Sequence, residues 1–422
     1  MDTTQYESII RLLNKELVPA LGCTEPIAIA YAAAALKRAL GQAPEKVEAA
    51  CSGNIIKNVQ GVIVPGTGDL RGVAASVAMG IVCGDMELEL EVLSKSTPED
   101  VAKARELVES GFCDVSILDS TEPLHILLTG TVGSDTAVAE VRGGHTDLVR
   151  LERNGELLIH RDAARQVEDK PAKGLLSPEN IYEFANTFRI EDLKELLDRQ
   201  IQYNLTIAEE GLAQGSGGAV GATLLQSRGN DVRTMACAYA AAGSDARMSG
   251  CMLPVVINSG SGNQGLTVSL PVIIYAQDLG ASDEQRYRAL AMSNLMALQQ
   301  KQYIGKLSAF CGAVCAGAGA GAGIAYLLGF DLPMIESVVM NSLAIVSGMV
   351  CDGAKASCAG KIAASVNAAI LAVDMTARKH AFTPGTGILA HGEADTIGNV
   401  GRMARDGMRK TDEVVLNIMI GK

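Results

Sequence analysis

Three cysteines, Cys311, Cys351 and Cys358, carry the residue types and spacing with the clearest chemical meaning in this sequence. Each lies among small residues in a strongly apolar region, in the segments FCGAVCAGAGAG and GMVCDGAKASCAGK. A structural cysteine does not need glycine and alanine on both sides, whereas a bulky inorganic cofactor does. Thiolates hold iron–sulfur clusters, and three thiolates on a four-iron cluster leave one iron for a substrate. The pattern therefore favours an iron–sulfur lyase.

The spacing of these cysteines is a weaker signal than their surroundings. Six residues separate Cys351 from Cys358, which suits a loop around the edge of a cluster. This spacing differs from the short CxxC pairs of zinc sites and from the ferredoxin run. Because free cysteines are often buried, three thiols packed inside helices are the alternative. Cys315 is also an alternative to Cys311, since one helical turn separates the two.

A fourth cysteine, Cys23, follows Gly22 and precedes Thr24, Glu25 and Pro26 at the expected start of a helix. Backbone N–H groups and the helix dipole stabilise a thiolate at such a position. A thiolate can act as a general base or as a nucleophile. Cys23 and Glu25 are therefore the catalytic candidates, and a purely conformational role of the Gly-Cys turn is the alternative.

Two glycine-containing loops are candidates for substrate binding. The segment SGSGNQG, residues 259–265, exposes backbone N–H groups that suit a carboxylate or a phosphate. It is neither a Walker A loop nor a GxGxxG turn, and a plain structural turn is the alternative. The segment SGNIIKN, residues 52–58, is similar and adds a lysine charge. The binding candidates are Ser52, Asn54, Lys57, Ser259, Ser261, Asn263 and Gln264.

The elements that must position these residues form an α+β pattern. Helices are expected over 5–18, 25–40 and 97–111, with loops and short helices over 46–84. MELELEVL, residues 86–93, alternates like a strand, and further short strands follow it. Helix returns at Pro178 after a Ser177 cap. We expect a mainly helical, Ala/Gly-rich catalytic domain from residues 1–84 and 177–422, with a small α+β domain inserted at 85–176.

Composition limits the classes of function. The 422 residues are 48% hydrophobic and only 4% aromatic, with 45 glycines, which predicts a core of closely packed backbones. The net charge of −12 argues against nucleic acid, because phosphates would not be neutralised. The apolar stretch 311–330 is mostly Gly and Ala, so a buried helix is expected there and not a membrane span.

Location and assembly follow from the same features. The first 17 residues, MDTTQYESIIRLLNKEL, predict an amphipathic helix and not a signal peptide. Ten cysteines without an export signal indicate a reducing compartment, so a cytoplasmic protein with free thiols is expected. The expected partner is a small amino-acid substrate, and the Ala/Gly helical surface is compatible with a homodimer.

Five segments together resemble a known family: LVPALGCTEPIAIAYAAA, SGNIIKN, GSGNQG, CGAVCAGAGAG and CDGAKASCAGK. They are similar to the L-cysteine desulfidase family, which is related to the alpha chains of iron–sulfur L-serine dehydratases. The resemblance runs from Glu16 to the last residue. It implies a [4Fe–4S] enzyme that eliminates sulfide from L-cysteine to give pyruvate and ammonia. The family's three cluster ligands fall on Cys311, Cys351 and Cys358, and its catalytic cysteine falls on Cys23.

Three other functions stay open at this point. An L-serine or L-threonine dehydratase on the same scaffold would eliminate a hydroxyl instead of a thiol. A non-catalytic iron–sulfur sensor or small-molecule binding protein would bind a ligand without turnover. A zinc hydrolase could be built on the same cysteines, and metal analysis would distinguish it.

Overall fold

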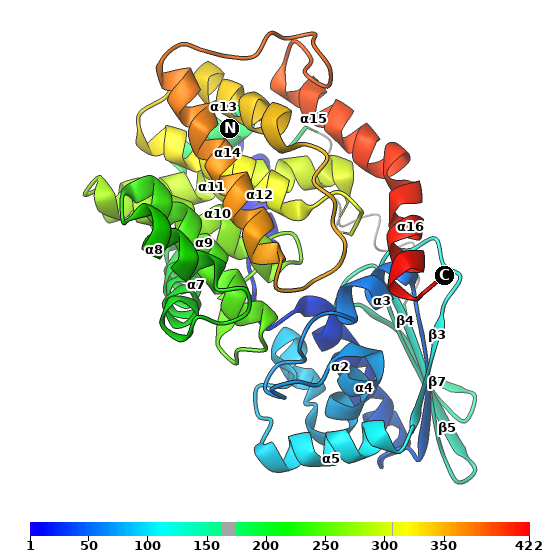
Figure 1. Cartoon of the computed structure of the whole chain (residues 1–422). Helices are drawn as coiled ribbons and strands as arrows, with labels where there is room; N and C mark the ends of the chain where they lie inside the picture. Colours follow the sequence, from blue (N-terminus) through cyan, green and yellow to red (C-terminus); the bar gives the residue numbers. More distant parts are fainter. Residues whose placement is uncertain (162–173, 306) are drawn as a thin grey trace.

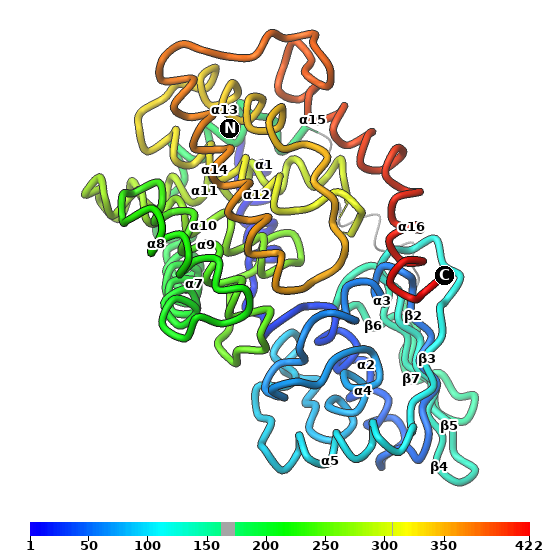
Figure 2. The backbone as a smooth tube through the Cα atoms, in the orientation of Figure 1, coloured from blue at the N-terminus to red at the C-terminus, as the bar shows by residue number. Residues whose placement is uncertain are grey.

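The computed structural model describes residues 1–161, 174–305 and 307–422 (Figure 1). The chain begins with α1 (Thr3–Glu16) in a large helical part, passes through a second part built on a mixed sheet, and returns to the helical part (Figure 2). This arrangement confirms the expected α+β class with a mainly helical domain.

The larger sheet has six strands in the order β3-β2-β4-β5-β6-β7. Strands β2 and β3 are parallel, and every other neighbouring pair is antiparallel. A separate antiparallel pair, β1 (Pro19–Leu21) with β8 (Pro254–Val256), joins segments far apart in the sequence. The bounds of the six strands are Lys46–Cys51 (β2), Cys113–Ile117 (β3), His125–Val132 (β4), Asp135–Arg142 (β5), Leu148–Arg153 (β6) and Glu156–His160 (β7).

Helices cover one face of this sheet (Figure 1). The long helix α2 (Thr24–Leu40) packs against β4, β5 and β6, while α4 (Gly72–Cys83) packs against α2, β3 and α5 (Pro98–Glu109). A short helix, α3 (Gly53–Val59), directly follows β2. Strand β2 therefore belongs to the sheet although it precedes residue 85. The division of the chain at that residue stays a prediction, and the sheet draws strands from both sides of it.

The predicted strand at 86–93 is wrong. These residues form a 3-10 helix, η1 (Met86–Glu91), whose start is capped by the Asp85 carboxylate accepting from Glu87 N–H at 3.2 Å. Val92 and Leu93 are both fully buried although they are neighbours in sequence, so these side chains do not alternate between a buried and an exposed face. The cap at Asp85 and the burial of two neighbouring side chains therefore favour a helical turn over the strand that the alternating pattern predicts.

The helical part contains the remaining elements. The Ser177 hydroxyl caps the first helix after the sheet, as predicted, and Pro178 occupies its first turn. The bounds are Pro178–Thr187 (α6), Ile190–Asp192 (η3), Lys194–Gln214 (α7), Val220–Arg228 (α8), Val232–Met248 (α9), Gly262–Asp278 (α10), Asp283–Ile304 (α11), Gly312–Leu327 (α12), Leu332–Val346 (α13), Cys358–Ala377 (α14), Glu393–Arg402 (α15), Met403–Gly407 (η4) and Arg409–Met419 (α16).

Helix α12 is the centre of the helical part and packs against α10, α11, α13 and α14. Its alternating glycines allow this, because each one faces a neighbouring helix: a Cβ on Gly319 would lie 2.7 Å from the Ser293 carbonyl oxygen, and one on Gly321 would lie 3.1 Å from the Ala369 Cβ. The helix is buried along most of its length, as expected from its composition.

Replacing Gly319 with alanine is expected to lower the free energy of unfolding by about 1–3 kcal/mol, because the new methyl group overpacks the contact with α11. Gly398 in α15 is the matched control, since a Cβ there meets nothing within 4 Å. Its replacement by alanine should raise stability by about 1 kcal/mol through helix propensity. Urea unfolding of both variants measures the two effects, and equal shifts would contradict the packing argument.

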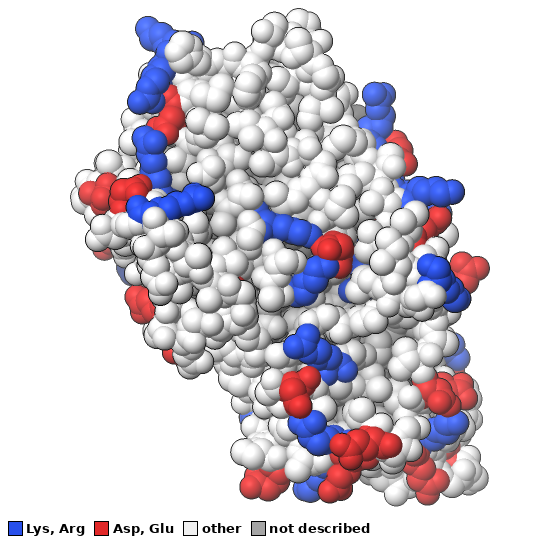
Figure 3. Space-filling view, in the orientation of Figure 1, with Lys and Arg blue, Asp and Glu red and all other residues white. Residues whose placement is uncertain are grey.

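The molecular surface has no dominant charge on the face seen in Figure 3. Basic and acidic side chains are interspersed there, and wide areas of the helical part carry no charge (Figure 3). One described helix, α14, is long and apolar enough to cross a membrane by length and composition alone, but half of that window is buried inside the protein.

Glu393, at the start of α15, is a buried carboxylate that predicts a pH-dependent stability. It is 3% exposed, its Oε2 accepts from Gln299 Nε2 at 3.1 Å, and its Oε1 has no partner. Burial raises the pKa of Glu393 from 4.5 to about 8, with the Gln299 hydrogen bond opposing the shift. The folded chain therefore binds an extra proton between these two values, and the free energy of unfolding falls as pH rises through that window.

Replacing Glu393 with glutamine should remove this dependence. The variant is expected to be about as stable as the wild type near pH 4.5, and more stable by about 2–4 kcal/mol above pH 8. Asp395→Asn, on the exposed side of the same helix, is the control and should leave the pH profile unchanged. Thermal or urea unfolding at both pH values measures the difference, and parallel profiles for Glu393→Gln and the wild type would contradict it.

Candidate functional site

A short backbone pairing brings two of the three predicted cluster cysteines together. Phe310 and Val350 form an isolated antiparallel bridge. The Cys311 N–H donates to the Met349 carbonyl at 3.0 Å, and the Cys351 N–H donates to the Ala309 carbonyl at 2.7 Å. Cys311 and Cys351 therefore lie on adjacent segments although 40 positions separate them in the sequence.

The third cysteine, Cys358, is the first residue of α14 and closes the loop that begins at Cys351. Burial raises the pKa of the Cys311 thiol to about 12, and the nearby Cys351 and Cys358 thiols add to the shift. Burial also raises the pKa of Cys358, with Cys351 contributing in the same direction. All three thiols thus lie within electrostatic range of one another.

Cys315 lies apart from this group. Its side chain is fully buried, burial raises its pKa to about 11, and Lys301, not another cysteine, is the charged group that acts on it. Its carbonyl accepts from Gln300 of α11 at 3.3 Å. Because Cys311 is the N-cap of α12 and Cys315 lies inside the helix, one turn is enough to separate their environments.

Two lysines fix the loop between Cys351 and Cys358. Lys355 and Lys361 both form ion pairs with Asp352, and Lys361 Nζ also donates to the Val350 carbonyl at 2.7 Å. The positive charge of Lys361 acts on both Cys311 and Cys358 in the direction that lowers a thiol pKa. These residues therefore supply positive charge beside the thiols as well as a rigid loop.

Cys23 and Glu25 form a hydrogen-bonded pair at the start of α2. The Cys23 thiol donates to Glu25 Oε2 at 3.0 Å, and Asn58 Nδ2 donates to Glu25 Oε1 at 3.3 Å. Thr24 Oγ1 donates to the Gly260 carbonyl at 3.0 Å and so ties this turn to the loop 259–265. Gly22 makes the turn possible: its φ is +58°, and a Cβ would lie 2.1 Å from the Pro65 Cγ.

The protonation state of Cys23 differs from the one expected from its helix position. Burial raises its pKa well above the usual value, and the Glu25 charge raises it further, while Arg247 opposes the shift. The effect of desolvation on the pKa of Cys23 is therefore larger than that of the helix N-terminus, and the side chain is a thiol in the free protein. Its proton lies on a hydrogen bond to a carboxylate that can accept it.

Cys23 also lies near one of the three predicted cluster cysteines. Its side chain packs in a small group with Val62 and Met248, and Cys358 packs against the same group. The positive charge of Arg247 reaches both Cys23 and Cys358. The fold thus brings the thiols of positions 23 and 358 to the same small group of side chains.

The loop 259–265 lies at this meeting point. Asn263 Oδ1 accepts from Arg247 Nη1 at 3.0 Å, and Ser259 Oγ donates to its neighbour Asn258 at 2.8 Å. Ser261 is the N-cap of α10. Gln264 is buried with an unpaired Oε1, next to Gly312 at the start of α12, where a Cβ would lie 2.6 Å from the Gln264 Cδ.

Two of the binding candidates from residues 52–58 already bond to other parts of the protein and so have a structural role. Ser52 Oγ donates to the Pro123 carbonyl at 2.7 Å. Lys57 is 1% exposed, forms an ion pair with Asp412 of α16, and donates to the Cys351 carbonyl at 3.3 Å. Asn54 keeps a buried Oδ1 without a partner. Lys57 therefore links the C-terminal helix to the cysteine loop, and its charge is already matched.

Helices that start at this site begin without a side-chain cap. The N-cap residues of α2, α3, α10 and α12 are Cys23, Ser52, Ser261 and Cys311, and none of them makes a side-chain cap hydrogen bond. The N-caps of α1, α5, α6, α9, α11 and α13 do make one, whereas α4, α7, α8, α14, α15 and α16 also begin without one. Uncapped N–H groups and helix dipoles favour negative charge, as thiolates and cluster sulfides carry.

The donor set fits a cluster better than a single ion. Among residues 1–161, 174–305 and 307–422, no group of three or more His, Cys, Asp or Glu side chains could hold a metal ion. Each thiolate of a four-iron cluster binds a different iron, so its ligands are spread more widely than those of one ion. Three mutually close thiols, a lysine charge and uncapped helix starts are consistent with such a cluster.

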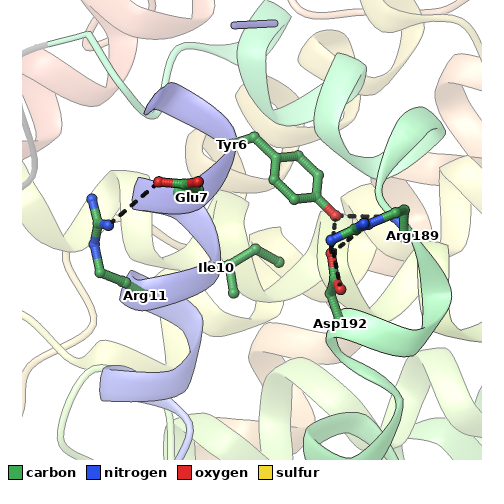
Figure 4. A pocket seen from close by; sticks show the side chains of 6 residues that line it. All are labelled: Tyr6, Glu7, Ile10, Arg11, Arg189 and Asp192. Atoms are coloured by element: carbon green, nitrogen blue, oxygen red, sulfur yellow. Dashed lines mark hydrogen bonds and ion pairs between the residues drawn. The ribbon is translucent and has the colours of Figure 1, made fainter. Parts of the chain in front are cut away.

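A surface hollow of about 320 Å³ lies elsewhere, between α1 and η3 (Figure 4). Its polar groups bind one another: Tyr6 Oη donates to Asp192 at 2.6 Å, Arg189 pairs with Asp192, and Arg11 pairs with Glu7. Its lining residues are Tyr6, Glu7, Ile10, Arg11, Arg189 and Asp192, and none is a site candidate.

Sequence reasoning missed two residues of this site. Asn58 lies in the segment SGNIIKN but was not singled out, although an Asn there can reach a carboxylate. Arg247 ends the run ACAYAAAGSDAR, in which it is the single arginine, but its burial is visible only in the structure.

The sequence profile of the serine dehydratase alpha chain matches residues 87–417. The chain belongs to the serine dehydratase alpha-chain family. The match includes Cys311, Cys351 and Cys358 together with the loop 259–265, and begins after Cys23. Family membership supports a lyase function related to that of the serine dehydratases, and it supports amino-acid catabolism as the general role.

Relatives are similar in sequence along nearly the whole chain. A UPF0597 protein of Lachnoclostridium phytofermentans is 47% identical over 98% of this chain and all of its own length. A UPF0597 protein of Desulfitobacterium hafniense is 47% identical over 99% of this chain and 97% of its own length. One from Treponema denticola is 41% identical over all of this chain and 99% of its own length.

Proposed function

We propose that this protein is an iron–sulfur-dependent lyase that converts L-cysteine to pyruvate, ammonia and sulfide. The observation that carries the proposal is that Cys23, hydrogen-bonded to Glu25, belongs to the small buried group against which Cys358 packs. A proton acceptor and a candidate cluster ligand thus face one small space, as β-elimination requires. Membership in the serine dehydratase alpha-chain family supports the reaction class.

Cys311, Cys351 and Cys358 would hold a [4Fe–4S] cluster. When bound through three thiolates, such a cluster supplies an iron without a protein ligand, which acts as a Lewis acid on the leaving group. The Lys361 charge stabilises the thiolates, and the Asp352 pairs keep the loop in place.

Cys23 would remove the α-proton of the substrate. Its own proton first passes to Glu25 along the 3.0 Å hydrogen bond, and Arg247 favours the resulting thiolate. Asn58 holds the Glu25 carboxylate in position. The thiolate then takes the α-proton while the β-substituent leaves, and the released aminoacrylate hydrolyses to pyruvate and ammonia.

The loop 259–265 would hold the substrate's backbone atoms. The unpaired Gln264 Oε1 offers an acceptor to a substrate ammonium group, and the N–H groups at the start of α10 offer donors to its carboxylate. Lys57 contributes by holding α3 against the cysteine loop, and Ser52 by holding the start of α3 to Pro123, since their polar atoms are already bonded.

An L-serine or L-threonine dehydratase is the second candidate, and the description of the matching family favours it. The two reactions use the same base and carboxylate contacts and differ only in the leaving group. A cytoplasmic location and a homodimer belong to the same proposal.

Anaerobic purification followed by iron and acid-labile sulfide analysis tests this function. About four irons per chain are expected, with sulfide and pyruvate released from L-cysteine in equal amounts. L-serine and L-threonine are assayed in parallel for pyruvate or 2-oxobutyrate. Faster turnover of L-serine would favour the dehydratase, whereas iron without turnover of any amino acid would favour a sensor or binding protein. Absence of iron would reject the cluster.

A further inference from the structure

Arg247 is a buried cation that forms no ion pair within the described part of the chain. It lies at the end of α9, is 1% exposed, and is the largest fully buried side chain among the described residues. Its Nη1 donates to Asn263 Oδ1 at 3.0 Å, while its Nε has no hydrogen-bond partner. No carboxylate in the described part of the chain forms an ion pair with it. A buried charge with one hydrogen bond and no ion pair is costly, so an anion would complete its surroundings.

The guanidinium lies where the site is expected to receive its substrate. A Cβ on Gly262 would be 2.3 Å from the Arg247 Nε, so the absence of a side chain in the loop makes room for this group. Its positive charge acts on Cys23, the proposed base, and on Cys358, a proposed cluster ligand. Asn263 fixes one edge of the guanidinium and leaves the Nε edge unpaired.

We propose that Arg247 binds the carboxylate of an α-amino-acid substrate, which rests on the proposed function. A carboxylate would give Nε an acceptor and the guanidinium a counter-ion in a single contact, which is the geometry that arginine favours. The α-carbon is bonded to the carboxylate carbon, so this contact would keep the α-carbon close to Cys23, on which the Arg247 charge acts. Asn263 is then a positioning residue that orients Arg247.

The experiment compares two ligands that differ only in the carboxylate. L-Alanine and ethylamine lack a β-leaving group, so neither is consumed and both can be titrated calorimetrically into the intact protein. The wild type is expected to prefer L-alanine by about 100-fold. Arg247→Met should reduce that preference to a few-fold, because it weakens the binding of L-alanine and leaves the binding of ethylamine unchanged. Arg247→Lys keeps the charge but loses the fork of donors and should give about a 10-fold preference.

Iron content and melting temperature are also measured on every variant. If Arg247 only balanced the charge of the thiolates, its replacement would change these two quantities and not the ligand preference. Loss of iron with an unchanged ligand preference would show that Arg247 stabilises the cysteine thiolates and does not bind the carboxylate, which would overturn the proposal. Equal binding of both ligands by the wild type would overturn it without any variant, so poor folding of Arg247→Met leaves it testable. The titration needs neither turnover nor iron, and failure of the lyase assay is therefore a separate result.

Discussion

Replacing Cys23 with serine is expected to lower turnover of the preferred amino acid by about 10²–10⁴-fold while iron content stays at the wild-type level. An alcohol is a far weaker acid than a thiol, so Glu25 cannot generate the anion that removes the α-proton. Cys23 belongs to the group against which Cys358 packs but is not in the predicted ligand set, so the cluster should remain. Anaerobic turnover assays with iron analysis on the same sample measure both quantities.

Two further variants make this prediction specific. Glu25→Gln removes the acceptor of the thiol proton and should lower turnover by about 10²-fold with little change in substrate affinity. Cys83→Ser is the matched control, because Cys83 lies at the end of α4 and its thiol only donates to the Met79 carbonyl. Full activity of Cys23→Ser with an intact cluster would remove Cys23 from the mechanism.

Replacing any one of Cys311, Cys351 or Cys358 with serine is expected to abolish both cluster binding and turnover. A cluster held by only three thiolates loses a third of its protein ligands, and serine is a poor ligand for iron in such a cluster. Iron per chain should fall from about four to near zero, and the visible absorbance of the cluster should disappear. Iron analysis and absorbance spectra after anaerobic reconstitution provide the measurement.

Cys315→Ser is the control for the ligand set, since Cys315 lies one turn from Cys311 but interacts with Lys301 and not with the other cysteines. This variant should keep its iron. The reverse outcome, loss of iron in Cys315→Ser and retention in Cys311→Ser, would exchange the two ligands. Retention of iron in all four variants would show that the cluster is bound elsewhere.

Most helices could be predicted because their signals are local. The Ser177 cap with Pro178, the small residues of α12 and the start of α2 after Cys23 each depend on neighbouring residues alone. The prediction of a strand at 86–93 was wrong because it too used only neighbouring residues, whereas a strand depends on distant ones. An alternating pattern needs a partner strand, and β2 takes the position beside β3 and β4 while Asp85 caps a 3-10 helix.

The sequence by itself determined which residue types could do chemistry here: thiols among small residues, a Gly-Cys turn before a helix, and a glycine-rich loop. It could not determine how they meet. The choice between Cys311 and Cys315, the ion pair that occupies Lys57, and the protonated state of Cys23 all depend on contacts from distant segments. Arg247 became a candidate only when its burial without a counter-ion was visible. Burial, charge pairing and desolvation are sums over the whole surroundings, and only the tertiary structure supplies those surroundings.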